Sequence, residues 1–167
     1  FPVSALVGRR DVMQWFEEVF FSFTFGGEAV SLAAARATIS QLRARGVGEL
    51  WTRGAKLRDG YNALAAEFGL QRRTECIGLA PRTVIAFKEA GGEESLVLKS
   101  LFQQECLKRG VLFSGGQNIC LAHTDQDIEA TLRVYRAAME ILAEAVAAGD
   151  APRRLAGPPV EPVFRRA

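Results

Sequence analysis

The segment best suited to chemistry reads SFTFGGE over residues 22–28. It places the hydroxyl of Thr24 and the backbone amides of Gly26 and Gly27 immediately before a stretch of strong helix formers. Backbone amides and the positive end of a helix dipole together favour an anionic group such as a phosphate. The residues alone leave two interpretations open: a phosphate-binding loop, or an ordinary loop in which Thr24 or a nearby polar group caps the helix.

Other residues capable of chemistry lie in weaker patterns. His123 is the only histidine, and we interpret it as a local hydrogen-bonding residue at a strand-to-helix junction rather than as a catalytic base. The glycine pairs at 91–92 and 115–116 fit neither glycine-rich nucleotide-binding pattern, so each predicts a turn. Arg82 lies in a predicted hairpin, where an arginine either binds a carboxylate ligand or pairs with another surface charge.

Composition excludes several classes of function. The odd set of Cys76, Cys106 and Cys120 has no CxxC spacing, which favours reduced, buried thiols over a disulfide framework or a zinc site. A formal charge of +2 is too small for a broad nucleic-acid or membrane-binding field. No apolar run reaches the roughly 20 residues of a membrane span, and no signal-peptide pattern opens the chain. We therefore expect a cytoplasmic globular protein without metal, nucleic-acid or membrane partners.

Four segments have the apolar spacing of helices. In chain order the predicted helices are residues 28–45, 50–68, 96–109 and about 124–149. Ser95 is the predicted N-cap of the third, and Thr124 with Asp127 forms a capping box at the start of the fourth. Glycines follow as stop signals at positions 46, 69, 110 and 149.

Two pairs of short β-rich runs lie between and after these helices. Residues 74–79 and 82–88 predict a hairpin, and residues 111–113 and 118–122 predict a second short pair. The alternation of strand pairs with helices implies a small antiparallel sheet with helices packed on one face. We therefore predict an α+β unit over residues 74–149.

The two ends of the chain differ from this unit. The first 70 residues predict a strand, a glycine turn and two helices. Residues 1–7 form an apolar run that would bury both faces as a strand, so it calls for neighbouring strands. Because the chain also lacks an initiator methionine, we expect a piece of a longer protein. Residues 151–167 carry four prolines and four arginines and predict a tail that lies on the surface or is disordered.

Several separated motifs carry a resemblance to one family. The segment FFSFTFGGEA at residues 20–29 resembles the threonine-glycine loop of class III pyridoxal-phosphate (PLP) aminotransferases, especially the glutamate-1-semialdehyde aminomutase-like branch. The opening FPVSALVGRRD at residues 1–11 is similar to the stretch that follows the cofactor-binding lysine in that family. FQQEC at 102–106 and AHTD at 122–125 resemble its C-terminal domain in the same order. The resemblance covers residues 1 to about 149.

The resemblance implies a fold-type-I enzyme that works as a homodimer and holds PLP through a lysine. It implies that Thr24, with Gly26 and Gly27, contacts the phosphate of the PLP bound in the neighbouring subunit. The cofactor lysine would precede Phe1, so we expect no catalytic residue in this chain. The lysines that the chain does contain stand in no matching context: Lys56, Lys88, Lys99 and Lys108.

The implied fold class is α/β and α+β, the C-terminal part of a fold-type-I PLP-dependent transferase. Residues 1–73 would form the distal end of the large PLP-binding domain, 74–149 the small C-terminal domain and 150–167 a Pro/Arg-rich tail. The complete enzyme would transfer an amino group from an amino donor to an aldehyde or ketone, or within one molecule, and this chain alone is expected to be inactive. Glu28-Ala29 stands where Asn-Pro is frequent in the family, which leaves the substrate and the choice between aminotransferase and aminomutase open.

Two alternatives to this reading of the resemblance remain. The first is a non-catalytic dimerisation or regulatory module derived from the same fold. The second is a small-molecule-binding domain unrelated to PLP. An upstream coding segment that ends in a lysine would favour the enzyme, whereas a native start codon at this point would favour the module.

Overall fold

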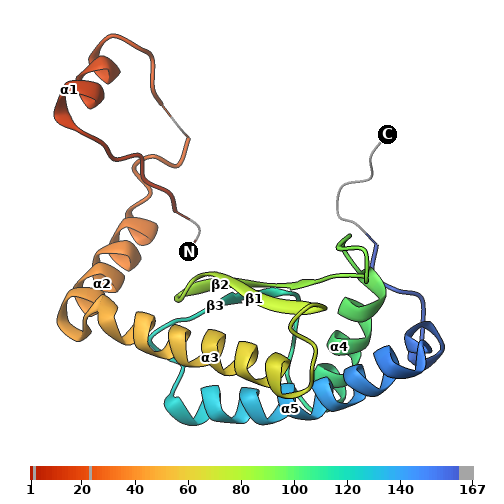
Figure 1. Ribbon diagram of the computed structural model, residues 1–167. Helices are drawn as coiled ribbons and strands as arrows, with labels where there is room; N and C mark the ends of the chain where they lie inside the picture. Colours follow the sequence, from red (N-terminus) through yellow and green to blue (C-terminus); the bar gives the residue numbers. More distant parts are fainter. Residues whose placement is uncertain (2, 23, 162–167) are drawn as a thin grey trace. The chain divides into compact units, whose positions relative to one another are not determined.

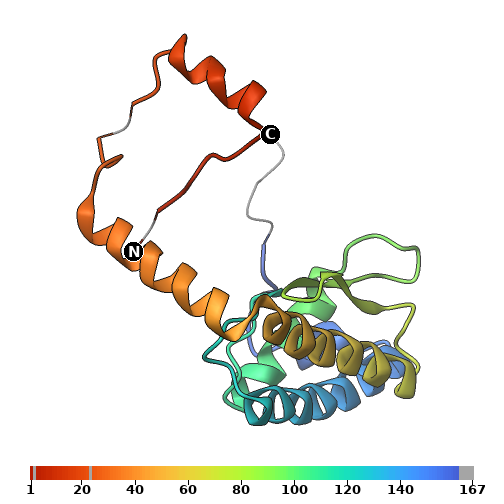
Figure 2. The same ribbon diagram turned by 90° about the vertical axis from the view of Figure 1, so that its left-hand side faces the viewer.

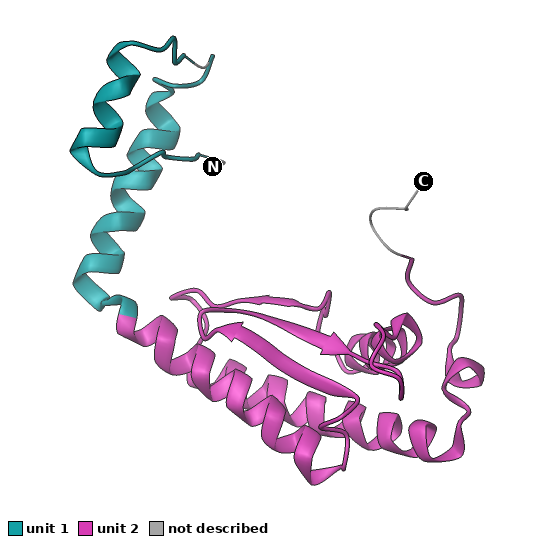
Figure 3. Ribbon diagram, turned by 45° about the horizontal axis from the view of Figure 1, so that its top comes forward, with its two compact units in different colours: residues 1–47 teal, residues 48–167 magenta. Residues whose placement is uncertain are grey.

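The chain divides into two compact units in the computed structural model, which describes residues 1, 3–22 and 24–161 (Figure 3). Unit 1 is Phe1–Val47 and unit 2 is Gly48–Ala167. The domain boundary expected at residue 73 therefore falls inside unit 2. The reason is that helix α3 (Val47–Glu67) buries Leu57, Tyr61 and Leu64 in the core of unit 2.

The sheet of unit 2 has three antiparallel strands in the order β1-β2-β3. They are β1 (Thr74–Leu79), β2 (Arg82–Phe87) and β3 (Gly116–Asn118). The predicted hairpin is confirmed, with Thr74 opposite Phe87 and Leu79 opposite Arg82. The second predicted pair is wrong, because residues 111–113 form no strand and β3 pairs with β2. Phe113 is buried in the core instead of taking part in a ladder.

Helices cover one face of this sheet, as predicted for an α+β fold (Figure 1). They are α3, α4 (Leu96–Lys108) and α5 (Asp125–Ala148). Ser95 Oγ accepts from Leu98 N at 3.2 Å, and Thr124 and Asp127 form the predicted capping box. Gly149 ends α5 in the left-handed conformation, with φ of 65°. No helix in the described part of the chain is both long and apolar enough to cross a membrane.

The core of unit 2 is built around aromatic rings. Phe102 is fully buried, and its ring lies 5.1 Å from that of Phe113 and 5.3 Å from that of Tyr135, centroid to centroid. One buried amide satisfies the polar groups beside these rings, because Gln117 Nε2 donates to Tyr135 Oη at 2.8 Å and Gln117 Oε1 accepts from Thr83 Oγ1 at 2.7 Å. Burial of polar groups is therefore compensated by hydrogen bonds, as a stable core requires.

A glycine decides how closely α3 approaches the hairpin. A Cβ atom built on Gly54 would lie 2.0 Å from the carbonyl oxygen of Ala80. No side chain fits in that space, so only glycine lets the helix backbone contact the turn between β1 and β2. The position of α3 over the sheet thus depends on one residue without a side chain.

The beginning of the predicted tail packs on α4. The short 3-10 helix η2 (Ala151–Arg154) buries Ala151, and Gln104 hydrogen-bonds the backbone on either side of Leu155, through Arg154 O at 3.0 Å and Ala156 N at 2.7 Å. The composition of this segment predicted a surface or disordered tail, and it lies on the surface of α4. Two of its backbone groups are thus satisfied by one side chain that lies about 50 residues earlier in the chain.

Unit 1 contains α1 (Arg10–Met13), the 3-10 helix η1 (Gln14–Glu17) and α2 (Ala29–Arg45), as Figure 2 shows. The helix predicted over residues 28–45 is confirmed by α2, and Gly46 follows it with φ of 80°. The strand expected over residues 1–7 is wrong for residues 1 and 3–7, which form no ladder. An apolar run becomes a strand only beside another strand, and the described part of unit 1 has none.

Candidate functional site

The turn at residues 24–27 leads into α2 and carries the residues predicted to bind phosphate. Glu28 N donates to Phe25 O at 3.1 Å and closes the turn. Thr24 is exposed, and a Cβ built on Gly27 would meet no heavy atom within 4 Å. The hydroxyl of Thr24 and the backbone of Gly27 are therefore accessible from solvent. Phe23, which precedes Thr24, lies outside the described residues.

Glu28 caps the N-terminus of α2. Its Oε1 accepts from Val30 N at 2.8 Å and its Oε2 from Ser31 N at 2.6 Å. Hydrogen bonds from Ser31, then from the Val30 amide, lower the pKa of the Glu28 carboxyl. The capping group is thus the nearby acidic residue and not Thr24. The sequence left open a cap by Thr24 or by a nearby polar group, and it did not single out Glu28 because glutamate is not a favoured N-cap residue, although a negative charge is favourable at this end of a helix.

A hollow inside unit 1 lies beside the same turn. Its volume is about 720 Å³, and its walls are mostly apolar side chains, with Gly26 at one edge; they are Ser4, Ala5, Leu6, Met13, Phe16, Phe21 and Gly26. The rings of Phe16 and Phe21 pack edge to face, with centroids 4.5 Å apart. A hollow of this size is in the usual range for small-molecule sites. Nothing in the sequence predicted it, since its walls come from segments without a shared motif.

His123 and Arg82 have separate, local environments in unit 2. The Nδ1 atom of His123 accepts from Cys120 N at 3.0 Å, which agrees with its interpretation as a junction residue. It lines a hollow of about 200 Å³ together with Gln117 and Tyr135, and Arg82 does not line that hollow. Arg82 is exposed at the start of β2, opposite Asn118. The structure does not bring these two candidates into one site.

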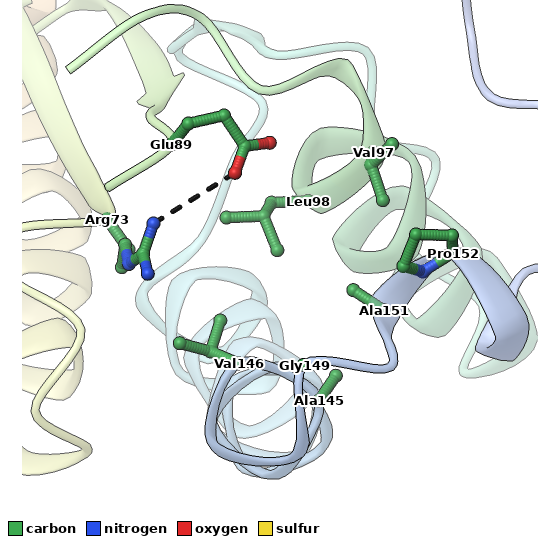
Figure 4. Close-up of a pocket in the computed structure, with 9 residues that line it drawn as sticks. All are labelled: Arg73, Glu89, Val97, Leu98, Ala145, Val146, Gly149, Ala151 and Pro152. Atoms are coloured by element: carbon green, nitrogen blue, oxygen red, sulfur yellow. Dashed lines mark ion pairs between the residues drawn. The ribbon is translucent and has the colours of Figure 1, made fainter. Parts of the chain in front are cut away.

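A further hollow in unit 2 opens between α4, α5 and η2 (Figure 4). Its volume is about 270 Å³, and apolar side chains such as Leu98 and Val146 form its walls. At one end Arg73 Nη1 lies 4.0 Å from a Glu89 carboxylate oxygen, an ion pair too long for a hydrogen bond. This volume is below the usual range for ligand sites, and none of the predicted site residues lines the hollow.

The cysteines divide into buried and exposed thiols. Cys76 and Cys106 are buried and free, whereas Cys120 is free and exposed, so the prediction of buried thiols is wrong for Cys120. Burial raises the pKa of the Cys106 thiol to about 12. Because the thiolate is the reactive form, Cys106 is chemically inert at neutral pH.

Comparison with known proteins gives one consistent group of relatives. The glutamate-1-semialdehyde 2,1-aminomutase 2 of Exiguobacterium sibiricum is 29% identical over 144 residues, 78% of this chain and 33% of the relative. The glutamate-1-semialdehyde 2,1-aminomutase of Methanothermobacter thermautotrophicus is 30% identical over 158 residues, 85% of this chain and 36% of the relative. No family model matches the chain.

A solved structure agrees with these relatives. The PLP internal aldimine form of the Sphingopyxis sp. MTA144 FumI protein superposes with a TM-score of 0.70 at 25% identity, covering 84% of this chain and 34% of that protein. The chain thus spans about a third of the length of the curated relatives it matches. In sequence and in fold, the chain is thus similar to a part of the glutamate-1-semialdehyde aminomutases and of a PLP-dependent protein, as the resemblance to class III PLP aminotransferases predicted.

Proposed function

We propose that this chain forms part of a PLP-dependent aminotransferase or aminomutase. The enzyme would transfer an amino group between an amino donor and an aldehyde or ketone, or within one molecule. The accessible turn at residues 24–27 is the observation that carries the proposal, since it has the residue types of the family's phosphate-contacting loop. PLP, when bound, supplies the electron sink for this chemistry. The contribution of this chain is to hold the phosphate of PLP.

The residues of the turn fit a phosphate group. The Thr24 hydroxyl can donate one hydrogen bond, and the amides of Gly26 and Gly27 can donate others. The open space at Gly27 leaves room for phosphate oxygens to approach the backbone. A small turn with an exposed hydroxyl is therefore suited to an anion with several acceptor oxygens.

Exposed apolar side chains around this turn support a homodimer. Phe20 is 96% exposed and Phe25 is 80% exposed, on either side of Thr24. Large apolar side chains that are exposed together mark surfaces that contact other protein. We therefore propose that a second subunit covers this region and binds most of the PLP, while Thr24 contacts the phosphate across the interface. A non-catalytic dimerisation module would use the same surface, but its dimer would not be stabilised by PLP.

We also propose that this chain alone holds no PLP covalently. Lys56 pairs with Glu129 at 2.7 Å, and Lys108 pairs with Glu105 at the same distance, so both amines are held in ion pairs with carboxylates of this chain. Incubation with PLP and borohydride, followed by mass spectrometry, is expected to detect no stoichiometric adduct at any one lysine. A stoichiometric adduct at one lysine would contradict this part of the proposal.

Substitution of Thr24 tests the proposed phosphate contact. A hydrogen bond to a charged group contributes about 1.5 to 3 kcal/mol, so Thr24→Ala in the complete enzyme is expected to weaken PLP affinity by roughly tenfold to a hundredfold. Thr24→Ser should lose much less, because it keeps the hydroxyl. Thr38→Ala is the matched control, since Thr38 donates to Ala34 O within α2. Titration of PLP measures its affinity, and dimer dissociation followed in parallel measures how far PLP stabilises the dimer. Unchanged PLP affinity in Thr24→Ala would disprove the contact.

A further inference from the structure

Two of the first amides of α2 are occupied by the chain itself. An α-helix begins with amides that have no partner inside the helix, and these are the groups that bind anions at helix N-termini. In α2 the amides of Val30 and Ser31 donate to separate oxygens of the Glu28 carboxylate, at 2.8 and 2.6 Å. A phosphate that bound there would have to displace this carboxylate.

Local charge near the turn also disfavours a phosphate. Residues 18–31 contain no lysine, arginine or histidine, whereas Glu18 and Glu28 both carry carboxylates. Hydrogen bonds from Ser31 and Val30 lower the pKa of Glu28, so its carboxylate is charged at neutral pH. The positive end of the α2 dipole is therefore neutralised by an internal anion before any ligand arrives.

We propose that Glu28 closes the N-terminus of α2 to phosphate and confines phosphate binding to the Thr24–Gly27 turn. This inference rests on the proposed function, because it concerns the same phosphate. The turn then supplies hydrogen bonds to the phosphate, and the positive charge that the phosphate needs comes from outside residues 18–31. Glu28 thereby keeps the unassembled chain from binding free phosphate tightly and makes tight binding depend on the second subunit.

Amide NMR of this chain with inorganic phosphate tests the inference directly. In the native sequence the Val30 and Ser31 amide resonances are expected to stay in place during the titration. In Glu28→Ala both resonances should move with added phosphate, because both amides lose their internal acceptor. Removing the Glu28 carboxylate, which repels phosphate, should raise the affinity of the α2 N-terminus for phosphate by about two- to fivefold at low salt, and this gain should disappear at high salt.

Two further variants keep the test decisive. Glu28→Asn removes the charge but keeps a favoured N-cap residue, so α2 should retain its start while at least one amide becomes available. Glu18→Ala is the matched control, because it removes an exposed carboxylate from unit 1 without freeing an amide of α2. It should leave the Val30 and Ser31 resonances insensitive to phosphate.

The outcomes separate this inference from the proposed function. Phosphate-dependent movement of Val30 and Ser31 in the native chain would overturn the inference, and so would no movement in either Glu28 variant. The proposed phosphate contact of Thr24 can be disproved independently. This would be the result if Thr24→Ala left PLP affinity unchanged while the Val30 and Ser31 amides of the Glu28 variants responded to phosphate. Movement of the two amides only in the Glu28 variants supports the role of Glu28.

Discussion

The two units use their apolar residues in opposite ways. Unit 2 buries Tyr61, Phe102 and Leu142 almost completely. In unit 1 no described residue is buried, and Phe20 and Phe25 are largely exposed. The contrast shows that unit 2 builds a core from its own residues, whereas the described part of unit 1 leaves its large apolar side chains exposed.

The contrast follows from which elements each unit contains. In unit 2 three helices pack on one face of a sheet, and each supplies an apolar stripe to the same core. Unit 1 has one long helix, and Leu32 and Ile39 on that helix are each 50% exposed. A single helix has no second layer on which to bury apolar side chains, so these stay exposed in unit 1.

The largest expected effect comes from the centre of the unit 2 core. Phe102 is 0% exposed, and truncation of a buried phenylalanine lowers the free energy of unfolding by about 3 to 5 kcal/mol. Phe102→Ala should therefore shift urea unfolding, followed by circular dichroism, to much lower denaturant. Phe20→Ala, at a position 96% exposed, should change the free energy by less than about 0.5 kcal/mol. Equal losses of unfolding free energy in the two variants would show that the units do not differ in how they use their apolar residues.

A smaller effect is expected where α3 contacts the hairpin. Gly54→Ala places a Cβ 2.0 Å from the Ala80 carbonyl oxygen. Such overpacking should lower the free energy of unfolding by about 1 to 3 kcal/mol. Gly48→Ala in the same helix meets nothing within 4 Å, and should instead stabilise unit 2 by about 0.5 to 1 kcal/mol. Thermal unfolding should show changes in stability of opposite sign for the two variants, which would support tight packing of α3 on the hairpin. A Gly54→Ala variant with unchanged stability would contradict it.

The smallest expected effect is electrostatic and depends on pH. Burial raises the pKa of Glu105, but hydrogen bonds, chiefly from Lys108 and Arg109, outweigh it and hold the pKa at about 2. A folded-state pKa below the ordinary value of 4.5 means that Glu105 stabilises unit 2 above that pH, and that this stability is lost as pH falls toward about 2. Glu105→Gln should lower the free energy of unfolding by about 1 to 2 kcal/mol at pH 7.

The pH profile separates this ion pair from a general charge effect. The difference between Glu105→Gln and the native chain should shrink in urea unfolding below about pH 4.5, where the unfolded carboxyl becomes protonated. Glu140→Gln changes an exposed glutamate of α5 and should leave the pH profile as in the native chain. A pH-independent loss in Glu105→Gln would mean that its ion pairs contribute nothing to stability.

Local signals in the sequence determined most of the secondary structure of unit 2. Ser95 and the capping box at Thr124 fixed the starts of α4 and α5, and the glycine after each helix marked its end. These signals work because a cap or a stop depends only on residues within one helical turn. The same holds for the hairpin of β1 and β2, whose strands are joined by a short turn. The similarity of the chain to PLP-dependent aminomutases could also be inferred, because the motifs that carry it lie in a fixed order along the sequence.

Only the tertiary structure decided which distant residues meet. β3 pairs with β2 and not with residues 111–113. The backbone of Gly54 lies so close to the Ala80 carbonyl that no side chain fits between them, and no sequence pattern predicts this approach. At the candidate site, the sequence singled out Thr24 and the glycines, whereas the bonds from the α2 amides to Glu28 are local and escaped prediction because glutamate is not a favoured N-cap residue. Strand pairing and burial are set by neighbours in space, whereas a sequence pattern records only neighbours along the chain.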